Sequence, residues 1–181
     1  MVPWGRYRGG PLTILAVLAA PIIMTALAGC GGETAGTATV GRSLEIHLRE
    51  PVLVQKLFYE QGPEHRIIQA RATNQQLALV HVTLVNRTST VIPLKIEQAV
   101  AQLGDRRGRR IDALNPFEAS KVVEAPELAE ENKYLPFLWD EVELAKQTQV
   151  AGWMVFEVPK GLRLGSFWWD EVDFIILDFP E

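Results

Sequence analysis

The stretch Gln76–Asn86, with the sequence QLALVHVTLVN, decides the fold class. Successive side chains of an extended strand point to opposite faces of a sheet. One face of this stretch carries Ala78, Val80, Val82 and Leu84, and the other carries Leu77, Leu79, His81 and Val85. Because apolar side chains occupy both faces, the stretch predicts a central strand that is covered on both sides.

Shorter segments with the same two-residue period surround this strand. Further strands are predicted at Ser43–Glu50, Val52–Glu60 and His65–Arg71, within Val91–Leu103, and at Ile111–Leu114, Thr148–Val158 and Val172–Phe179. Turn sequences separate them, among them the stretch QGPE at 61–64 and the stretch GDRRGRR at 104–110. About seven short strands separated by turns predict an all-β chain folded as an antiparallel β-sandwich.

Residues 115–147 interrupt the strand pattern. Asn115 is a predicted helix N-cap, with Pro116 at the first helical position and Glu118 at the third, so a helix of about two turns is expected to reach Glu124. A second short helical start is expected at 126–131. We therefore expect a short helical or irregular insertion near 115–147.

Three segments together resemble the telokin-like, immunoglobulin-like extracellular domains of many bacterial lipoproteins. They are Gln76–Ser89, Val150–Gly161 and the terminal strand Val172–Phe179. The resemblance covers most of Val52–Phe179 and implies an immunoglobulin-like β-sandwich, which we expect to occupy 43–181. It carries no catalytic residues onto this chain.

The first 29 residues are predicted to be a signal peptide. Arg6 and Arg8 precede the uncharged run Leu12–Ala28, which has the sequence LTILAVLAAPIIMTALA. A basic segment followed by an apolar segment and small residues is typical of secretory signals. The alternative is a transmembrane anchor, but Pro21 interrupts the run and no basic cluster follows it.

The sequence Leu27-Ala28-Gly29-Cys30 resembles the lipobox of bacterial lipoproteins. The resemblance implies cleavage between Gly29 and Cys30, a diacylglycerol thioether on the Cys30 sulfur, and a lipid-anchored protein on the extracytoplasmic face of the cell membrane or outer membrane. Two or three acyl chains anchor a protein stably. Residues 30–42, rich in Gly, Thr and Ala, are then expected to be a flexible, lipidated tether.

Composition limits the possible functions. Arg6 and Arg8 account for two of the 18 basic residues, so the chain from Cys30 onward keeps 16 basic residues against 22 acidic ones, a net charge of −6. Nucleic-acid binding needs a basic footprint, so that class is excluded. Cys30 is the only cysteine, and its acylation leaves none for a disulfide.

No constellation of residues predicts an enzyme, a metal site or a cofactor. His47, His65 and His81 fall on three separate predicted strands without nearby acids at ligand spacing. Two acidic groups offer a calcium-dependent or enzymatic alternative, although solvated faces are the simpler interpretation: Asp140, Glu141 and Glu143, and Asp170, Glu171 and Asp173. The arginine-rich stretch 105–110 either contacts lipid phosphates or is a solvated hairpin tip.

Four aromatic residues are candidate partner-binding residues: Tyr134, Phe137, Trp139 and Trp169. The alternative is that the run Tyr134–Trp139 covers an open sheet edge or the end of the core. Trp168 and Trp169 are adjacent, so one is expected in the core and the other at its rim. The sequence predicts a non-catalytic binding or structural module that meets an envelope protein, peptide or glycan, or else an accessory subunit of a transport or secretion complex.

Overall fold

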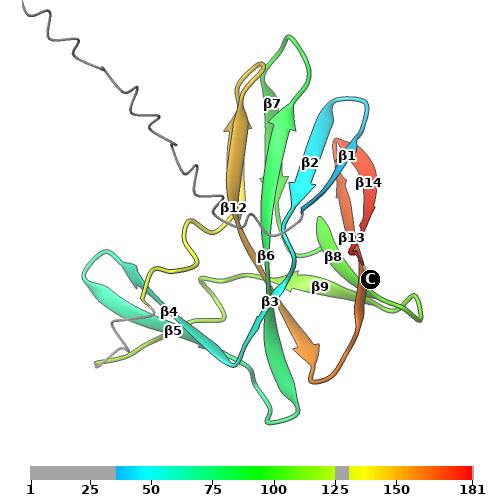
Figure 1. The fold of residues 1–181 in the computed structure, drawn as a ribbon. Helices are drawn as coiled ribbons and strands as arrows, with labels where there is room; N and C mark the ends of the chain where they lie inside the picture. The colour runs from blue at the N-terminus through cyan, green and yellow to red at the C-terminus, as the bar shows by residue number, and fades with distance from the viewer. Residues whose placement is uncertain (1–35, 125–130, 181) are drawn as a thin grey trace, which may run out of the picture. The chain divides into compact units, whose positions relative to one another are not determined.

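The computed structural model describes residues 36–124 and 131–180. These residues form antiparallel β-sheets and contain no helix. Figure 1 shows their arrangement. The strands are β1 (Thr37–Val40), β2 (Leu44–Leu48), β3 (Val52–Val54), β4 (Lys56–Gln61), β5 (Glu64–Gln69), β6 (Gln75–Asn86), β7 (Ile92–Ile96), β8 (Ala101–Asp105), β9 (Arg110–Leu114), β10 (Lys121–Val122), β11 (Asp140–Leu144), β12 (Gln149–Pro159), β13 (Leu164–Glu171) and β14 (Asp173–Asp178).

The predicted central strand is confirmed as β6. It pairs with β12 along one side, from Gln75 to Val85, and with β2 and β3 along the other. Its two faces enter two different hydrophobic cores, as the alternation of apolar residues required. Ala78 and Val80 lie in the first core, and Leu77 and Leu79 lie in the second; all four are fully buried.

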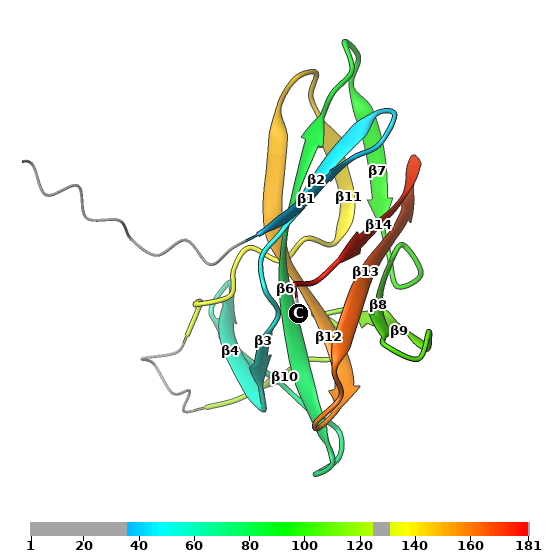
Figure 2. The same ribbon diagram turned by 45° about the vertical axis from the view of Figure 1, so that its right-hand side comes forward.

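The first core is enclosed by the largest sheet and the two-stranded sheet of β7 and β11. The path of that sheet is β1-β2-β6-β12-β9-β8-β13-β14, and its two edge strands, β1 and β14, lie in contact. Figure 2 shows them side by side. Asp173 joins the two edges, because its Oδ2 accepts hydrogen bonds from the amides of Ser43 (2.6 Å) and Leu44 (2.8 Å). The sheet is therefore close to closing on itself, which leaves few open edges.

The second core lies on the opposite face of β6 and β12. A small sheet, with strand order β10-β5-β4, covers this face. Leu57 and Tyr59 of β4 and Ile68 of β5 pack there against Leu77 and Val155. Covering both faces buries the apolar side chains that a single sandwich layer would leave in water, which is the main source of stability in such a fold.

Several expected elements differ in the structure. The helix expected from Asn115 is wrong. Asn115 does cap a turn, since its Oδ1 accepts the amide of Phe117 (3.0 Å), but the chain then enters strand β10. The expected strand Val52–Glu60 divides into β3 and β4. Part of the expected tether pairs with β2 as strand β1, because Thr37–Val40 alternates between half-buried and exposed residues.

Other predictions fall outside the described residues. These are the signal peptide at 1–29, the lipidation site Cys30 and most of the second helical start at 126–131. All of the described residues belong to one compact unit. In this part of the chain, no helix has the length and apolar character that a membrane crossing requires.

Candidate functional site

The hairpin that joins β8 to β9 holds a cluster of arginines in a fixed turn. Asp105 is the centre of this turn, because its Oδ1 accepts the amides of Arg107 (2.8 Å) and Arg109 (2.9 Å). Gly108 adopts a φ of 80°, which a glycine tolerates without strain. The Asp105 side chain is only 7% exposed, while the arginine side chain of Arg109 is 58% exposed. The turn therefore buries its acid and presents its bases.

The same contacts perturb the ionisation of Asp105. The hydrogen bond from the Arg109 amide, then the bond from the Arg107 amide and the charges of both arginines, lower the pKa of the Asp105 carboxyl, although burial opposes them. The carboxylate thus stays ionised at neutral pH, and its oxygens are engaged by the turn. Its Oδ2 also lies 3.5 Å from Nε of Arg109, so the single negative charge of Asp105 offsets one positive charge of the turn.

The turn between β12 and β13 lies beside this hairpin. Strand pairing places Leu164 of β13 opposite Asp105 of β8, so the two turns meet at the same end of the sheet. Gly161 adopts a φ of 75°, and the amide of Lys160 is fixed by the carbonyl of Asn74 at 2.9 Å. The sheet register therefore carries two further cations, Lys160 and Arg163, to the arginine hairpin.

Between the two turns lies a cavity of about 580 Å³, which we call the basic groove. Its lining consists of Asp105, Arg106, Arg107, Arg109, Pro159, Lys160, Gly161, Leu162 and Arg163. Five of these nine residues are cationic, although the chain as a whole has a net charge of −4. Guanidinium groups form forked hydrogen bonds with phosphates and carboxylates, so the chemistry of this groove suits an anion.

The predicted partner-binding aromatic residues lie elsewhere, and two of them are inaccessible. Trp169 is fully buried in the first core and Tyr134 is 7% exposed in the second core. As surface contacts these two predictions are wrong. Phe137 and Trp139 are half-buried and pack against the second and first cores respectively. Trp168 is half-buried beside the buried Trp169, so the expected split between core and rim is confirmed.

The alternative for the run Tyr134–Trp139 is confirmed, because this segment covers an edge of β12. The amide of Trp153 donates to the carbonyl of Pro136 (2.8 Å), and the amide of Leu138 donates to the carbonyl of Trp153 (2.9 Å). Gly152 permits the approach: a Cβ there would lie 2.9 Å from the Leu138 nitrogen and the Pro136 oxygen. The aromatic run therefore serves packing.

The structure brings acids of the two groups to one small cavity, but not as a compact set of metal ligands. Glu141, Glu143 and Glu171 line one small cavity together with Lys95, and Glu171 accepts the Lys95 amide at 3.2 Å. Asp173 is occupied by the amides of Ser43 and Leu44. Among the described residues, none of the six acids belongs to a set of three converging metal ligands.

The expectation that the histidines lack nearby acids is wrong for His47 and His65. Nε2 of His47 lies 2.8 Å from Oε1 of Glu45, and Nδ1 of His65 lies 2.6 Å from Oε1 of Glu131. His81 instead packs edge-on against Trp153, with ring centroids 5.0 Å apart. Burial, and then the charge of Arg49, lower the pKa of His81, which therefore stays neutral as a packed side chain.

Sequence reasoning missed the basic groove because its two halves are about fifty residues apart. The arginines of the hairpin were visible as a run, but Lys160 and Arg163 join them only through the pairing of β8 with β13. Two exposed apolar residues on β14, Phe174 (58% exposed) and Ile176 (40%), were also unexpected. The ring of Phe174 packs against Trp168, and the guanidinium of Arg110 lies 3.7 Å from the centre of the Trp168 ring.

Comparisons with known proteins assign no family. No family model and no curated protein matches the chain. One solved structure is similar, the yjhA protein from Bacillus subtilis, at 15% sequence identity and a TM-score of 0.45, covering 75% of this chain and 80% of that one. At that level of similarity, nothing about a ligand or a partner carries over to this chain.

Proposed function

We propose that this chain is a lipid-anchored, non-catalytic binding module of the cell envelope, and that its basic groove captures an anionic ligand. Anchoring would run through Cys30, after cleavage of residues 1–29 at Gly29. The finer assignment, a bacterial lipoprotein with a telokin-like, immunoglobulin-like domain, belongs to this proposal and is supported by the sequence resemblance together with the all-β, antiparallel architecture.

The observation that carries the proposal is the convergence of five cations on one cavity. In a chain with a net charge of −4, random placement of bases would scatter them among acids. Here Asp105 is the only acid that lines the groove; it accepts two backbone amides and pairs with Arg109 at 3.5 Å, so one negative charge faces five positive ones. Phosphate or carboxylate groups of an envelope glycan or of a lipid headgroup have the charge and the hydrogen-bond acceptors that such a groove accommodates.

Capture of a protein partner is the second candidate. It is favoured by the exposed face of β14, where Phe174 and Ile176 point outward beside the half-buried Trp168. Exposed aromatic and aliphatic side chains are common at protein interfaces. An accessory role in a transport or secretion complex would use this face, and it is compatible with a ligand in the groove.

Calorimetry tests the groove directly. Tripolyphosphate titrated into the full-length protein in detergent should bind, and the double variant Arg107→Gln/Arg163→Gln should bind at least tenfold more weakly, since each charge-assisted hydrogen bond is worth about 1.5–3 kcal/mol. The double variant Arg71→Gln/Arg87→Gln is the matched control. It removes the same charge from arginines outside the groove that pair with Glu157 (3.5 Å) and Glu45 (3.0 Å).

The control should change the dissociation constant less than threefold. Equal weakening in both variants would indicate unspecific attraction by net charge and would refute the groove as a site, as would the absence of binding to the unmodified protein.

A further inference from the structure

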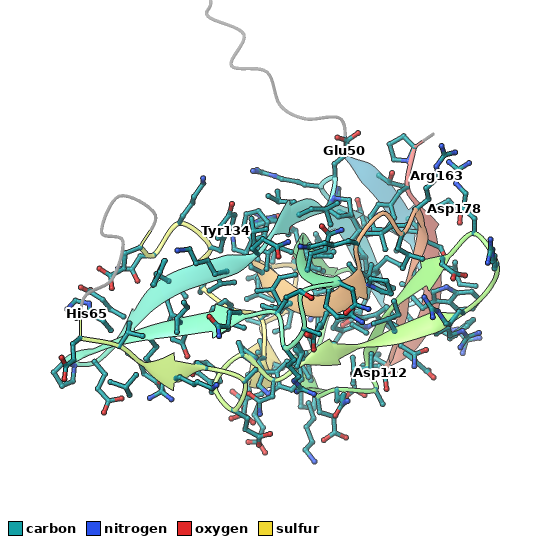
Figure 3. All side chains as sticks on the ribbon, turned by 90° about the horizontal axis from the view of Figure 1, so that it is seen from below. Glu50, His65, Asp112, Tyr134, Arg163 and Asp178 are labelled. Carbon is teal, nitrogen blue, oxygen red and sulfur yellow. The ribbon has the colours of Figure 1, made fainter. Side chains whose placement is uncertain are left out.

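A second cluster of polar side chains lies at the end of the β4–β5 hairpin, away from the basic groove (Figure 3). Strand pairing places Glu60 of β4 directly opposite His65 of β5, across the tight turn at Gly62 and Pro63. Glu131 reaches the same point from a distant part of the chain through a bridge to Phe58. The strand pairing and the bridge thus bring the imidazole of His65 close to the carboxylates of Glu60 and Glu131.

The three groups are close enough to share one ion. Nδ1 of His65 lies 2.6 Å from Oε1 of Glu131 and 3.8 Å from Oε1 of Glu60. All three ligating atoms lie within 4.8 Å of one another, and this is the one such group among the described residues. Ligands of a tetrahedral ion at ~2.1 Å are about 3.4 Å apart, so small side-chain rotations would bring these atoms into place.

Glu131 is the most informative member of the cluster. Its side chain is only 6% exposed, whereas Glu60 is 50% exposed and His65 35%. Burying an ionised carboxylate is unfavourable unless the group is paired or coordinates a metal ion. The buried carboxylate of Glu131 contacts Nδ1 of the imidazole, and the carboxylate of Glu60 lies 3.8 Å from the same ring nitrogen.

The backbone around the cluster is fixed by hydrogen bonds. Oδ1 of Asn132 accepts the amide of Glu60 (2.8 Å), and the amide of Asn132 donates to the carbonyl of Phe58 (3.1 Å). These bonds hold the segment that carries Glu131 against strand β4. The ligands therefore project from a braced backbone, as a specific metal site requires.

We propose that Glu60, His65 and Glu131 form a zinc-binding site. With a neutral imidazole the three ligands carry a charge of −2, which matches a divalent cation. Zinc accepts one nitrogen and two carboxylate oxygens, whereas calcium and magnesium prefer oxygen ligands alone. Three protein ligands leave a fourth position for water. The site is separate from the basic groove, so either proposal can fail without the other.

The pair His47 and Glu45 provides a matched control within the chain. Its ring nitrogen and carboxylate oxygen are also in contact, at 2.8 Å, but the His47 side chain is 47% exposed and no third ligand completes the set among the described residues. If zinc recognises a three-ligand site, substituting His65 must weaken zinc binding far more than substituting His47 does. If zinc binds any exposed histidine, the two substitutions must weaken zinc binding to a similar extent.

Isothermal titration of zinc chloride into the full-length protein in detergent tests the site. The unmodified protein should bind one zinc ion per chain with a micromolar or tighter dissociation constant. His65→Ala and Glu131→Gln should each weaken binding at least tenfold, and His47→Ala should change it less than twofold. No zinc binding by the unmodified protein, or equal losses in His65→Ala and His47→Ala, would overturn the proposal.

X-ray absorption of the zinc-loaded, unmodified protein gives a second test that needs no variant. It should report one imidazole nitrogen and otherwise oxygen ligands at ~2.0–2.1 Å. Two or more imidazole ligands, or a shell of six oxygens, would contradict this ligand set even if a variant failed to fold.

Discussion

Val172 has a φ of 67° in the one-residue turn between β13 and β14, where Glu171 pairs with Asp173. A β-branched residue is strained in this left-handed region, at a cost of about 1–2 kcal/mol. The strain is tolerated because the turn places Asp173 where it accepts the amides of Ser43 and Leu44. A local cost is thus offset by a contact that joins the two edges of the largest sheet.

Replacing Val172 with glycine should raise the free energy of unfolding. Glycine removes the strain but adds about 0.5–1 kcal/mol of unfolded-state entropy, so the expected net gain is about 0.5–1 kcal/mol in urea unfolding. Val122→Gly in β10 is the control, because Val122 is similarly exposed (56% against 53%) and has no positive φ. It should destabilise the protein. Equal destabilisation by both substitutions would show that the backbone of Val172 is unstrained.

Individual side-chain positions were predictable where they depended on alternation alone. Leu44, Ile46 and Leu48 are buried and His47 points outward, as the period of two required. The contact between His65 and Glu131 was not predictable, because the two residues are 66 positions apart. The pairing of Glu60 with His65 was within reach: a four-residue turn at 61–64 places the residues that flank it opposite each other.

The absence of a side chain at Gly152 allows the segment 136–138 to pack directly on strand β12. The segment 136–138 lies on β12 so closely that a Cβ at Gly152 would lie 2.9 Å from backbone atoms of Leu138 and Pro136. Those backbone atoms are themselves hydrogen-bonded to Trp153. The aromatic run can therefore cover the edge of β12 only because this position carries no side chain.

The substitution Gly152→Ala should lower the free energy of unfolding by about 1–3 kcal/mol, as overpacking of a tight contact does. Gly165→Ala in β13 is the control, since a Cβ there would lie 3.4 Å or more from its neighbours. Chemical unfolding monitored by tryptophan fluorescence measures both. A loss for Gly165→Ala as large as that for Gly152→Ala would argue against close docking of the segment.

The insertion at 115–147 was the part of the fold that sequence could not predict. Asn115 does act as a cap, since its Oδ1 accepts the amides of Phe117 (3.0 Å) and Glu118 (3.4 Å). Short helices are marginal without tertiary support, however, and Lys121 and Val122 instead gain partners in β5. Strand β11 likewise pairs with the edge of β7, and the polar–apolar alternation over 141–144 was too short to predict it alone.

At the scale of the whole molecule, the all-β class followed from the sequence, but the closure of the sheet did not. Closure depends on the contact between β1 and β14, near opposite ends of the described chain. Asp173 had been grouped with the surface acids, yet it bonds to amides 129 and 130 positions away. The basic groove also depends on contacts between distant segments, because the pairing of β8 with β13 brings its two turns together.

Membrane anchoring concerns the whole chain, and a substitution of Cys30 tests it. Only a thiol can form the thioether of a lipoprotein, so Cys30→Ser should abolish both lipid attachment and cleavage. In a bacterial host, the unmodified protein should partition with membranes at the mass of a processed, acylated chain. The variant should keep residues 1–29 and lose acyl label from fed palmitate. Acyl labelling of the variant equal to that of the unmodified protein would rule out Cys30 as the attachment site.

The central claim is that the groove between the β8–β9 and β12–β13 turns is the binding site for an anion. Backbone amide shifts of the full-length protein in detergent, recorded by NMR during titration with tripolyphosphate at fixed ionic strength, test it most directly. We predict saturable shifts concentrated at residues 105–109 and 160–163, the two turns between which the groove lies. Shifts spread over exposed lysines and arginines throughout the sheet, or no saturable shifts at these two turns, would contradict it.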